Sequence, residues 1–359
     1  MIRPGLQKKL SKIQRDPLLS AKAVGLRYVN DTAPGLTRRR WGKHFHYVDG
    51  AGNRCTDEQV LQRIKKLALP PAWENVWICA DENGHLQATG VDARGRKQYR
   101  YHAGWNDIRS QTKYFRLPQF AEALPMIRER LEHDLKLPGF PYHKILALAV
   151  RILEQTNIRI GNEVYKNLYG SFGLTTLQNR HVRVNGVEIQ FQFKGKKGVI
   201  HTLQLKSRRL ARLIRQCREI PGRELFQYFD EQGQRCSIGS GDVNQYLKEI
   251  TGMDFTAKDF RTWAGTITAF RVFRELGPAA SAAESKRNLL QAIDTVAENL
   301  GNTRAVCRKY YIHPAVLQAY ENGDFFNYLH EMPETSAEKT WLNAEEKMLK
   351  ELLTEYAWE

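Results

Sequence analysis

The hydrophobic spacing of this chain changes from a strand pattern to a helix pattern near residue 107, and this change constrains the fold more than any other feature. Before it, HFHYVD (44–49) and VWICAD (76–81) alternate apolar or aromatic residues with polar ones, as β-strands do. Asn83-Gly84 predicts a hairpin turn into a further strand. After it, apolar residues recur at helical spacing. We therefore predict an α+β fold of two domains, a small β-rich domain over residues 1–107 and a mainly helical domain over 108–359.

A single β segment interrupts the helical part. Residues 181–207 alternate like strands, with Asn185-Gly186 at one turn and KGKKG (194–198) at the next, which predicts a three-stranded antiparallel meander. One helix is also predicted inside the β-rich part, at 56–69, with Thr56 as its N-cap and Pro70-Pro71 as its stop. The other predicted helices lie at residues 117–137, 142–157, 207–220, 242–250, 256–276 and 286–300, followed by an acidic amphipathic helix at 343–355.

The charge balance indicates a polyanionic partner. The 359 residues include 55 Lys and Arg against 39 Asp and Glu, a net charge of +16, which favours binding to nucleic acid. A basic surface that serves only solubility is the alternative. The distribution argues against this alternative, because residues 1–110 hold 20 cationic and 10 acidic side chains, whereas residues 331–359 hold 3 and 8.

Other classes of protein are disfavoured by the sequence. The apolar run ILALAV (145–150) is flanked by charged residues and is too short to span a membrane. The basic N-terminus lacks the apolar run of a signal peptide. The five cysteines have no Cys-x-x-Cys spacing, which fits a reduced cytosolic compartment better than a disulfide framework or a zinc site. We expect a cytoplasmic protein without a membrane partner, a metal or another cofactor.

Four segments carry residues suited to chemistry, and each has an ordinary structural explanation when taken alone. Arg159 follows an apolar helix, where an arginine usually complements the helix dipole. The lysines of KGKKG lie at a hairpin tip, where they are usually solvated. Arg261 stands among apolar and aromatic residues inside a helix, and therefore needs an acidic or phosphate partner. In GNTRAVCRKYYIHPAV (301–316), two adjacent tyrosines follow three cationic side chains, and a tyrosine pair usually serves packing.

Taken together, these residue types meet the requirements of phosphodiester transfer. Guanidinium groups clamp non-bridging oxygens with paired donors, and a lysine can protonate a leaving alkoxide. A tyrosine can attack phosphorus and conserve the bond energy in a covalent phosphodiester. No cluster of Asp and Glu suggests a two-metal site. The set therefore indicates metal-free chemistry.

Motifs along nearly the whole chain point to one family. They are GRKQYRYH (95–102), IRIGNEVY (158–165), GLTTLQNRHV (173–182), FKGKKGVIH (193–201), KDFRTW (258–263) and GNTRAVCRKYYIHPAV (301–316). In this combination the chain closely resembles the type IB DNA topoisomerases, in particular their poxvirus-like and bacterial branch.

The resemblance implies catalytic roles position by position. The family's two catalytic arginines fall on Arg159 and Arg261, and the general acid for the 5′ oxygen falls on Lys196. The family has His or Asn after a glycine, nine residues before the nucleophile, which puts Asn302 and Tyr311 at these positions. Asn302 departs from the histidine of the viral pattern, so a neutral hydrogen-bond donor is implied there. The group that takes the tyrosine proton stays open.

The resemblance also implies contacts to DNA. Lys258, just before the second arginine, is expected to contact a phosphate. The predicted N-terminal contacts are Arg96, Lys97, Gln98, Tyr99 and Tyr101, since cations beside aromatic side chains suit phosphates and base edges. A β-strand with one aromatic face is the alternative. Tyr310 is expected to support packing beside the nucleophile.

The implied function is relaxation of supercoiled duplex DNA by a monomer whose two domains clamp the double helix. A 3′-phosphotyrosyl intermediate would form, the broken strand would swivel, and the 5′-hydroxyl would reseal the nick without ATP or metal. The protein would be associated with the nucleoid. A tyrosine recombinase shares this chemistry but usually has a histidine two or three residues before the second arginine, where this chain has Lys258. A DNA-binding protein without chemistry is the other alternative.

Overall fold

The computed structural model describes residues 17–42, 44–92, 95, 97–105, 114–329 and 341–356. The chain forms two compact units, Ile2–Phe115 and Arg116–Glu359, which we call the N-terminal and C-terminal units. The domain boundary predicted at residues 107 and 108 falls within 106–113, outside the described residues, and stays a prediction.

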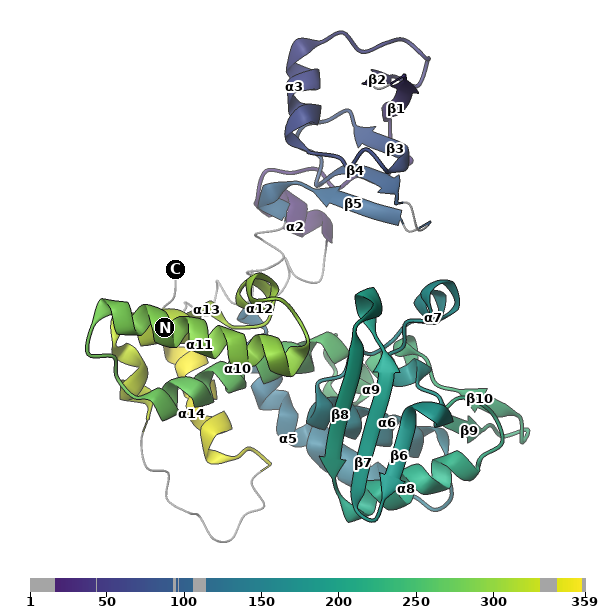
Figure 1. The fold of residues 1–359 in the computed structure, drawn as a ribbon, viewed down its shortest axis with the longest axis vertical. Helices are drawn as coiled ribbons and strands as arrows, with labels where there is room; N and C mark the ends of the chain where they lie inside the picture. Colours follow the sequence, from purple (N-terminus) through teal and green to yellow (C-terminus); the bar gives the residue numbers. More distant parts are fainter. Residues whose placement is uncertain are drawn as a thin grey trace. The chain divides into compact units, whose positions relative to one another are not determined.

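A five-stranded antiparallel sheet forms the N-terminal unit, in the order β2-β1-β3-β4-β5. Helix α3 packs on this sheet, where Ile64 meets Val76, Ile78 and Ala88 in a small core (Figure 1). The strands predicted at 44–49 and 76–81 are confirmed as β2 and β3. The elements of this unit are α2 (Pro17–Ala23), β1 (Gly35–Trp41), β2 (His44–Val48), α3 (Glu58–Lys66), β3 (Glu74–Cys79), β4 (Leu86–Val91) and β5 (Lys97–Tyr101).

Helix α3 begins one residue later than predicted. The N-cap is Asp57 rather than Thr56, because the Asp57 carboxylate accepts hydrogen bonds from the backbone N–H groups of Gln59 and Val60. The helix also ends before the two prolines, since Ala68 takes a positive φ of 47°. The predicted helix is therefore correct in type and wrong at both ends.

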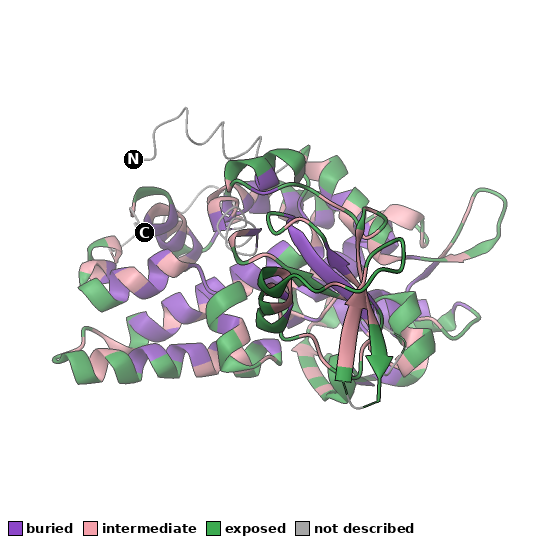
Figure 2. Ribbon diagram, turned by 90° about the horizontal axis from the view of Figure 1, so that it is seen from above, coloured by how far each residue is buried: buried purple, intermediate pink, exposed green. Residues whose placement is uncertain are grey.

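The C-terminal unit is mainly helical and is built around α10. Most of α10 is buried, including charged Asp259 and Arg261. Figure 2 shows buried residues along the helices of the chain. The longer helices here are α5 (Leu117–Asp134), α6 (Tyr142–Thr156), α8 (Arg208–Glu219), α9 (Ser240–Thr251), α10 (Ala257–Leu276), α11 (Ala282–Leu300), α13 (Pro314–Asn322) and α14 (Ala344–Glu355), with the shorter helices α7 (Glu163–Tyr169) and α12 (Arg304–Tyr310).

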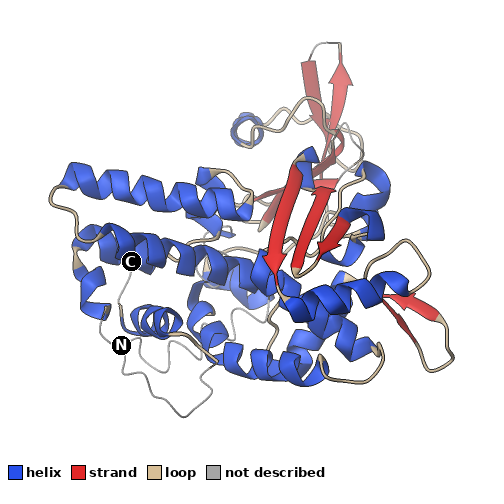
Figure 3. Cartoon of the chain, turned by 60° about the horizontal axis from the view of Figure 1, so that its bottom comes forward, coloured by secondary structure: helices blue, strands red, loops and turns tan. Residues whose placement is uncertain are grey.

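The predicted three-stranded meander is present. Strands β6 (Val182–Asn185), β7 (Glu188–Lys194) and β8 (Ile200–Lys206) pair antiparallel in that order, and the short turn Lys196–Gly198 connects the last two (Figure 3). A separate hairpin of β9 (Gln227–Phe229) and β10 (Arg235–Ser237) was not predicted. The expected architecture, a β-rich unit followed by a mainly helical unit with a three-stranded sheet, is therefore confirmed.

The acidic helix predicted at 343–355 is confirmed as α14, and it packs on the unit's own core. Glu346 accepts two hydrogen bonds from the Arg128 guanidinium of α5, at 2.6 and 2.7 Å. Arg271 and Arg274 of α10 form ion pairs with Glu345. Within the described parts of the chain, no helix is both long enough and apolar enough to cross a membrane.

Candidate active site

Arg159 lies just after α6, where the chain turns. Asn157 ends the helix in the left-handed conformation, at φ 54°, and this turn carries Arg159 toward the loop between α11 and α12. Its Nη2 donates to the Gly301 carbonyl at 3.0 Å and to Asn302 Oδ1 at 2.6 Å. These two hydrogen bonds link the segment around residue 159 to the segment around residue 302.

Arg261 is held by backbone carbonyls from two helix ends. It is 5% exposed and lies in the second turn of α10. One guanidinium nitrogen donates to the carbonyl of Asn157, and Nη2 donates to that of Leu300 at 2.8 Å. Its Nε is buried and has no hydrogen-bond partner among the described residues. An unpaired buried donor is costly, and a phosphate oxygen is a suitable acceptor for it.

Asn302 lies in the tight turn between α11 and α12, and Tyr311 comes directly after α12. Gly301 ends α11 in the left-handed region, at φ 57° and ψ 52°, a conformation that glycine adopts without strain. Thr303 then caps α12 through the backbone N–H of Val306. One short helix later comes Tyr311, half-buried, with its ring centroid 5.1 Å from Arg261 Cζ. Motifs about 50 and 150 residues apart therefore meet at one place.

The backbone of Tyr311 lies directly against α10. A β-carbon built on Gly265 would be 2.4 Å from the Tyr311 carbonyl oxygen, so no side chain fits at that position. Thr266 also contacts this segment, since its hydroxyl accepts from the backbone N–H of His313 at 3.1 Å. Residues 265 and 266 of α10 thus fix where the tyrosine backbone sits relative to Arg261.

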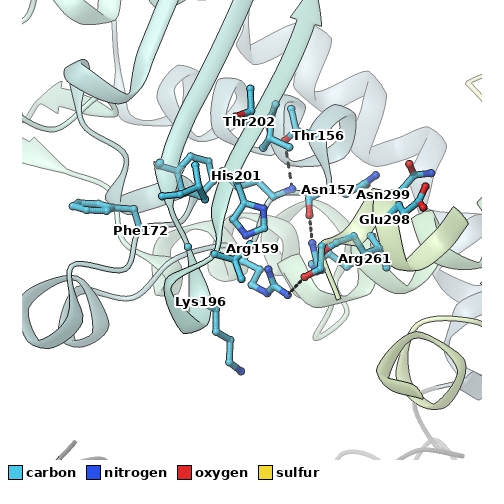
Figure 4. A pocket seen from close by; sticks show the side chains of 18 residues that line it. Thr156, Asn157, Arg159, Phe172, Lys196, His201, Thr202, Arg261, Glu298 and Asn299 are labelled. Carbon is cyan, nitrogen blue, oxygen red and sulfur yellow. Dashed lines mark hydrogen bonds between the residues drawn. The ribbon is translucent and has the colours of Figure 1, made fainter. Parts of the chain in front are cut away.

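Lys196 lies at the edge of a pocket that Arg159 and Arg261 also line. This pocket, of about 260 Å³, is lined by Arg159, Arg261, Lys196 and Gly301, among other residues. Lys196 is exposed at the β7–β8 tip, and in Figure 4 its side chain extends away from the two arginines. The structure therefore brings Arg159, Arg261, Asn302 and Tyr311 together and leaves the Lys196 ammonium outside this group.

The site is strongly electropositive. Burial and the nearby Arg261 lower the pKa of Arg159, yet guanidinium groups stay protonated in proteins. Within the described residues, the hydrogen bonds of these two cations go to backbone carbonyls and an amide oxygen. Two like charges side by side are unfavourable in isolation and attract an anion. The arrangement is suited to a phosphate group.

His201 is a member of the site that the sequence analysis missed. The ring lines the pocket from β8 and stacks on Phe193, with centroids 5.4 Å apart. Burial, followed by the charges of Arg159 and Arg261, lowers its pKa, which favours a neutral imidazole at neutral pH. The available signal was its position in KGKKGVIH, directly across the hairpin from Phe193.

The remaining predicted residues have varied settings. Lys258 is exposed, one helical turn before Arg261. Tyr310 is 37% exposed, with Lys309 Nζ 5.7 Å from its ring centroid. Its expected role in packing stays a prediction.

The predicted N-terminal contacts belong to β5 in the other unit. Tyr99 and Tyr101 are exposed and stack with ring centroids 6.0 Å apart. Lys97 forms an ion pair with Asp31 at 2.5 Å, and Gln98 donates to Asp92 at 2.9 Å. Arg96 lies outside the described residues. The two tyrosines thus form an exposed aromatic surface on β5, an edge strand of the sheet.

The expectation that no metal is needed stays a prediction. Within the portion of the chain that the structure describes, no group of three or more His, Cys, Asp or Glu side chains is placed to hold a metal ion. The cationic side chains of the pocket are themselves poor ligands for a metal.

Comparison with known proteins gives one consistent result. The family model of the eukaryotic DNA topoisomerase I catalytic core matches residues 102–335, and that of the bacterial DNA topoisomerase IB N-terminal domain matches residues 44–92. The chain is 31% identical over 300 residues to the DNA topoisomerase 1B of Acanthamoeba polyphaga mimivirus, covering 81% of this chain and 89% of the viral protein. It is 23% identical over 274 residues to the DNA topoisomerase 1B of Vaccinia virus (strain Copenhagen), covering 75% and 83%.

Proposed function

Because the chain belongs to the type IB DNA topoisomerases, we propose that it relaxes supercoiled duplex DNA through a transient single-strand break made by Tyr311. The observation that carries this proposal is the meeting of Arg159, Arg261, Asn302 and Tyr311 at one electropositive place. These residues come from three segments that are remote in sequence, and packing alone does not require that combination.

In the proposed reaction, the Tyr311 phenolate oxygen attacks a backbone phosphorus. A bond forms between this oxygen and phosphorus, and the bond from phosphorus to the 5′ oxygen breaks. The strand's 3′ end is then held as a phosphotyrosine, and the other end leaves as a 5′-hydroxyl. Torsion in the DNA drives rotation, and the 5′-hydroxyl attacks the phosphotyrosine to restore the original bond. The number of phosphodiester bonds is unchanged, so no ATP is required.

Arg159 and Arg261 neutralise the two non-bridging oxygens in this proposal. The buried Nε of Arg261, which has no partner among the described residues, gains an acceptor when a phosphate binds. The carbonyls of Asn157 and Leu300 fix the orientation of this guanidinium in advance. Preorganised donors of this kind contribute strongly to transition-state stabilisation, so loss of either arginine should slow cleavage by roughly 10²–10³.

Asn302 accepts a hydrogen bond from Arg159 and, in this proposal, donates one to the phosphate. Its Oδ1 accepts the Arg159 hydrogen bond at 2.6 Å, while Nδ2 makes only a long contact of 3.4 Å to the Leu300 carbonyl. Nδ2 can therefore turn its donors to a non-bridging oxygen. A protonated histidine has no acceptor for Arg159, so asparagine adds a positioning contact that a cationic histidine lacks.

Lys196 donates the proton to the departing 5′ oxygen. Because its side chain is exposed at the β7–β8 tip and extends away from the two arginines, we expect the tip to move toward them when DNA binds. The short turn Lys196–Gly198 includes two positive φ angles, 63° at Lys197 and 81° at Gly198. Neighbouring cations and desolvation against DNA would favour release of the proton.

The N-terminal unit supplies further contacts to the same duplex. The exposed pair Tyr99 and Tyr101, with Lys97, Gln98 and Arg96 beside it in sequence, suits base edges and phosphates. Lys258 contacts a phosphate next to the site. We propose that the two units act as a clamp in a monomer, and that the protein works at the nucleoid.

A plasmid relaxation assay with EDTA and without ATP tests this function. The wild type should relax supercoils, and Tyr311→Phe should not, because its side chain lacks the attacking oxygen. Tyr310→Phe is the matched control: the neighbouring phenol is surface-exposed, so this variant should relax DNA at the wild-type rate. Peptide mapping of the trapped covalent adduct should identify Tyr311 as the DNA-linked residue.

The same assay distinguishes the alternatives. Strand exchange between two sites would indicate a recombinase, and a mobility shift without cleavage would indicate a binding protein. Relaxation by Tyr311→Phe would exclude Tyr311 as the nucleophile.

A further inference from the structure

The His201 ring lies between the two glycines that precede Lys196 and Asn302. A β-carbon on Gly195 would be 2.4 Å from His201 Cδ2 and 2.7 Å from Nε2. A β-carbon on Gly301 would be 2.7 Å from Cε1 on the ring. All three distances are far inside van der Waals contact, so a side chain at either glycine would clash with the imidazole.

The ring itself is held in place. His201 pairs with Phe193 in the β7–β8 register and stacks on its ring at an interplanar angle of 25°. Because Phe193 is 5% exposed, this stack anchors the imidazole to the hydrophobic core. In Figure 4, His201 lies beside Arg159, above the Lys196 turn.

The position of the His201 imidazole between these two turns favours its neutral form. Burial lowers the pKa of His201, and so do Arg159 and Arg261. Arg159 also donates to the Gly301 carbonyl at 3.0 Å, so the Gly301 backbone is in contact with the ring on one side and with a catalytic arginine on another.

We propose that His201 is a positioning residue that sets the spacing between the Lys196 turn and the Asn302 turn. This proposal rests on the roles proposed above for those two side chains. The tip of a hairpin is otherwise poorly constrained, yet a general acid must come within hydrogen-bond reach of the oxygen it protonates. A fixed ring against Gly195 limits where Lys196 can swing when the tip closes.

The first test compares two leaving groups in single-turnover cleavage. One duplex has the natural 5′ oxygen at the scissile phosphate, and the other has sulfur there. A thiol has a pKa of about 8.5, so a departing thiolate needs little help from an acid. His201→Ala should slow cleavage of the oxygen substrate roughly 10–100-fold, which is less than full loss of a general acid at about 10²–10⁴-fold, and should slow the sulfur substrate much less.

Two variants calibrate this comparison. Lys196→Ala should show the same rescue by sulfur, and Arg261→Ala should be slow on both substrates. If His201→Ala is equally slow on both, the residue does not act through Lys196 and the proposal fails. If Tyr311→Phe still forms a covalent adduct, the proposed function fails instead, so the two failures are distinguishable.

The second test adds a methyl group at Gly195, where it would clash with the His201 ring, and then removes the ring. Gly195 has φ −96°, which suits alanine, so Gly195→Ala should impair cleavage only through its contact with the ring. In the His201→Ala background the added methyl group has room, and Gly195→Ala should cost little further rate. Simple additivity of the two effects would overturn the proposal.

Gln204→Ala is the control for both tests. It lies on the same strand, three residues further on and exposed, and should cleave both substrates at the wild-type rate. A defect at this position equal to that of His201→Ala would mean that any change in β8 disturbs the site, which would also overturn the proposal.

Discussion

Gly265 keeps α10 in contact with the backbone of Tyr311. Gly265→Ala would place a β-carbon 2.4 Å from the Tyr311 carbonyl oxygen, and neither backbone can yield without shifting a helix. The tyrosine ring should then move away from Arg261. Because a misplacement of about 1 Å can cost roughly 10²-fold in rate, we expect cleavage to slow about 100-fold, measured as covalent adduct formation in a single turnover.

Gly241→Ala is the matched control for this glycine. Gly241 lies in α9, and a β-carbon there meets no heavy atom within 4 Å. The control should cleave at the wild-type rate. Equal rates for wild type and Gly265→Ala would contradict the close approach of α10 to Tyr311.

Asn302→Asp separates the two roles of that side chain. The aspartate keeps an acceptor for Arg159, and the charge-assisted bond is stronger than the original one. It also loses the Nδ2 donor and brings a negative charge to the phosphate. We expect cleavage to slow by roughly 10²–10³ while the melting temperature does not fall. Wild-type cleavage rates in this variant would exclude a donor role for Asn302.

Motifs can identify single residues, but not the contacts that position them. Arg159, Arg261, Asn302 and Tyr311 were found because they stand in recognisable segments, and the structure brings them together, although their roles stay predictions. Nothing in the sequence shows that Gly265 meets residue 311, or that His201 meets Gly301. These contacts depend on how elements pack over separations of 46 and 100 positions along the chain.

At the scale of elements, α14 is held by a buried ion pair. Glu346 and Arg128 have side chains only 7% and 15% exposed. Although burial alone raises the pKa of Glu346, hydrogen bonds and charge from Arg128 hold it below the ordinary value. The Trp263 indole of α10 also donates to Glu346, at 3.4 Å, so this carboxylate joins three helices.

Glu346→Gln should therefore destabilise the protein in a pH-dependent way. A depressed pKa in the folded state stabilises the protein above the unfolded pKa of about 4.3 and loses this effect as the pH falls through the folded value. Arg128 keeps its bond to Glu154, at 2.7 Å, so we expect a loss of about 2–3 kcal/mol at pH 7. Denaturant unfolding from pH 7 to pH 3 should show the difference from wild type shrinking below about pH 4.

A difference that stays constant over this range would contradict the ionic explanation. Glu351→Gln offers a comparison on the same helix. Glu351 is less buried than Glu346, so its effect on stability should change less with pH.

The elements themselves were predictable where their periodicity was long or their turns were distinctive. Helices α10 and α11 show sustained apolar spacing, and the meander carries Asn-Gly and Lys-Gly turns. The short elements were missed: α7 has seven residues with none buried, and β9 and β10 have three residues each. Their length gives too few positions for a pattern, and tertiary contacts decide their conformation.

On the scale of the whole molecule, charge is distributed to suit a polyanion. The excess of cations lies in residues 1–330, since the last 29 residues have more acidic than basic side chains. Part of the negative charge of helix α14 is neutralised by ion pairs with Arg128, Arg271 and Arg274 of the same unit. The long-range field that a duplex meets therefore comes from cations in both units.

If both units grip the same duplex, the salt dependence of binding should reveal it. The affinity should fall steeply with salt, because each phosphate contact releases condensed counterions and the logarithmic slope is about −0.9 per contact. Lys97→Ala in the N-terminal unit and Lys258→Ala in the C-terminal unit should each reduce the slope by about one. The double variant should reduce it by about two, since separate sites add. Lys206→Ala is the control, because Lys206 lies at the end of β8 that is remote from the Lys196 turn, and its slope should match the wild type. A normal slope for Lys97→Ala would mean that β5 does not contact phosphate, and a clamp built on that strand would be ruled out.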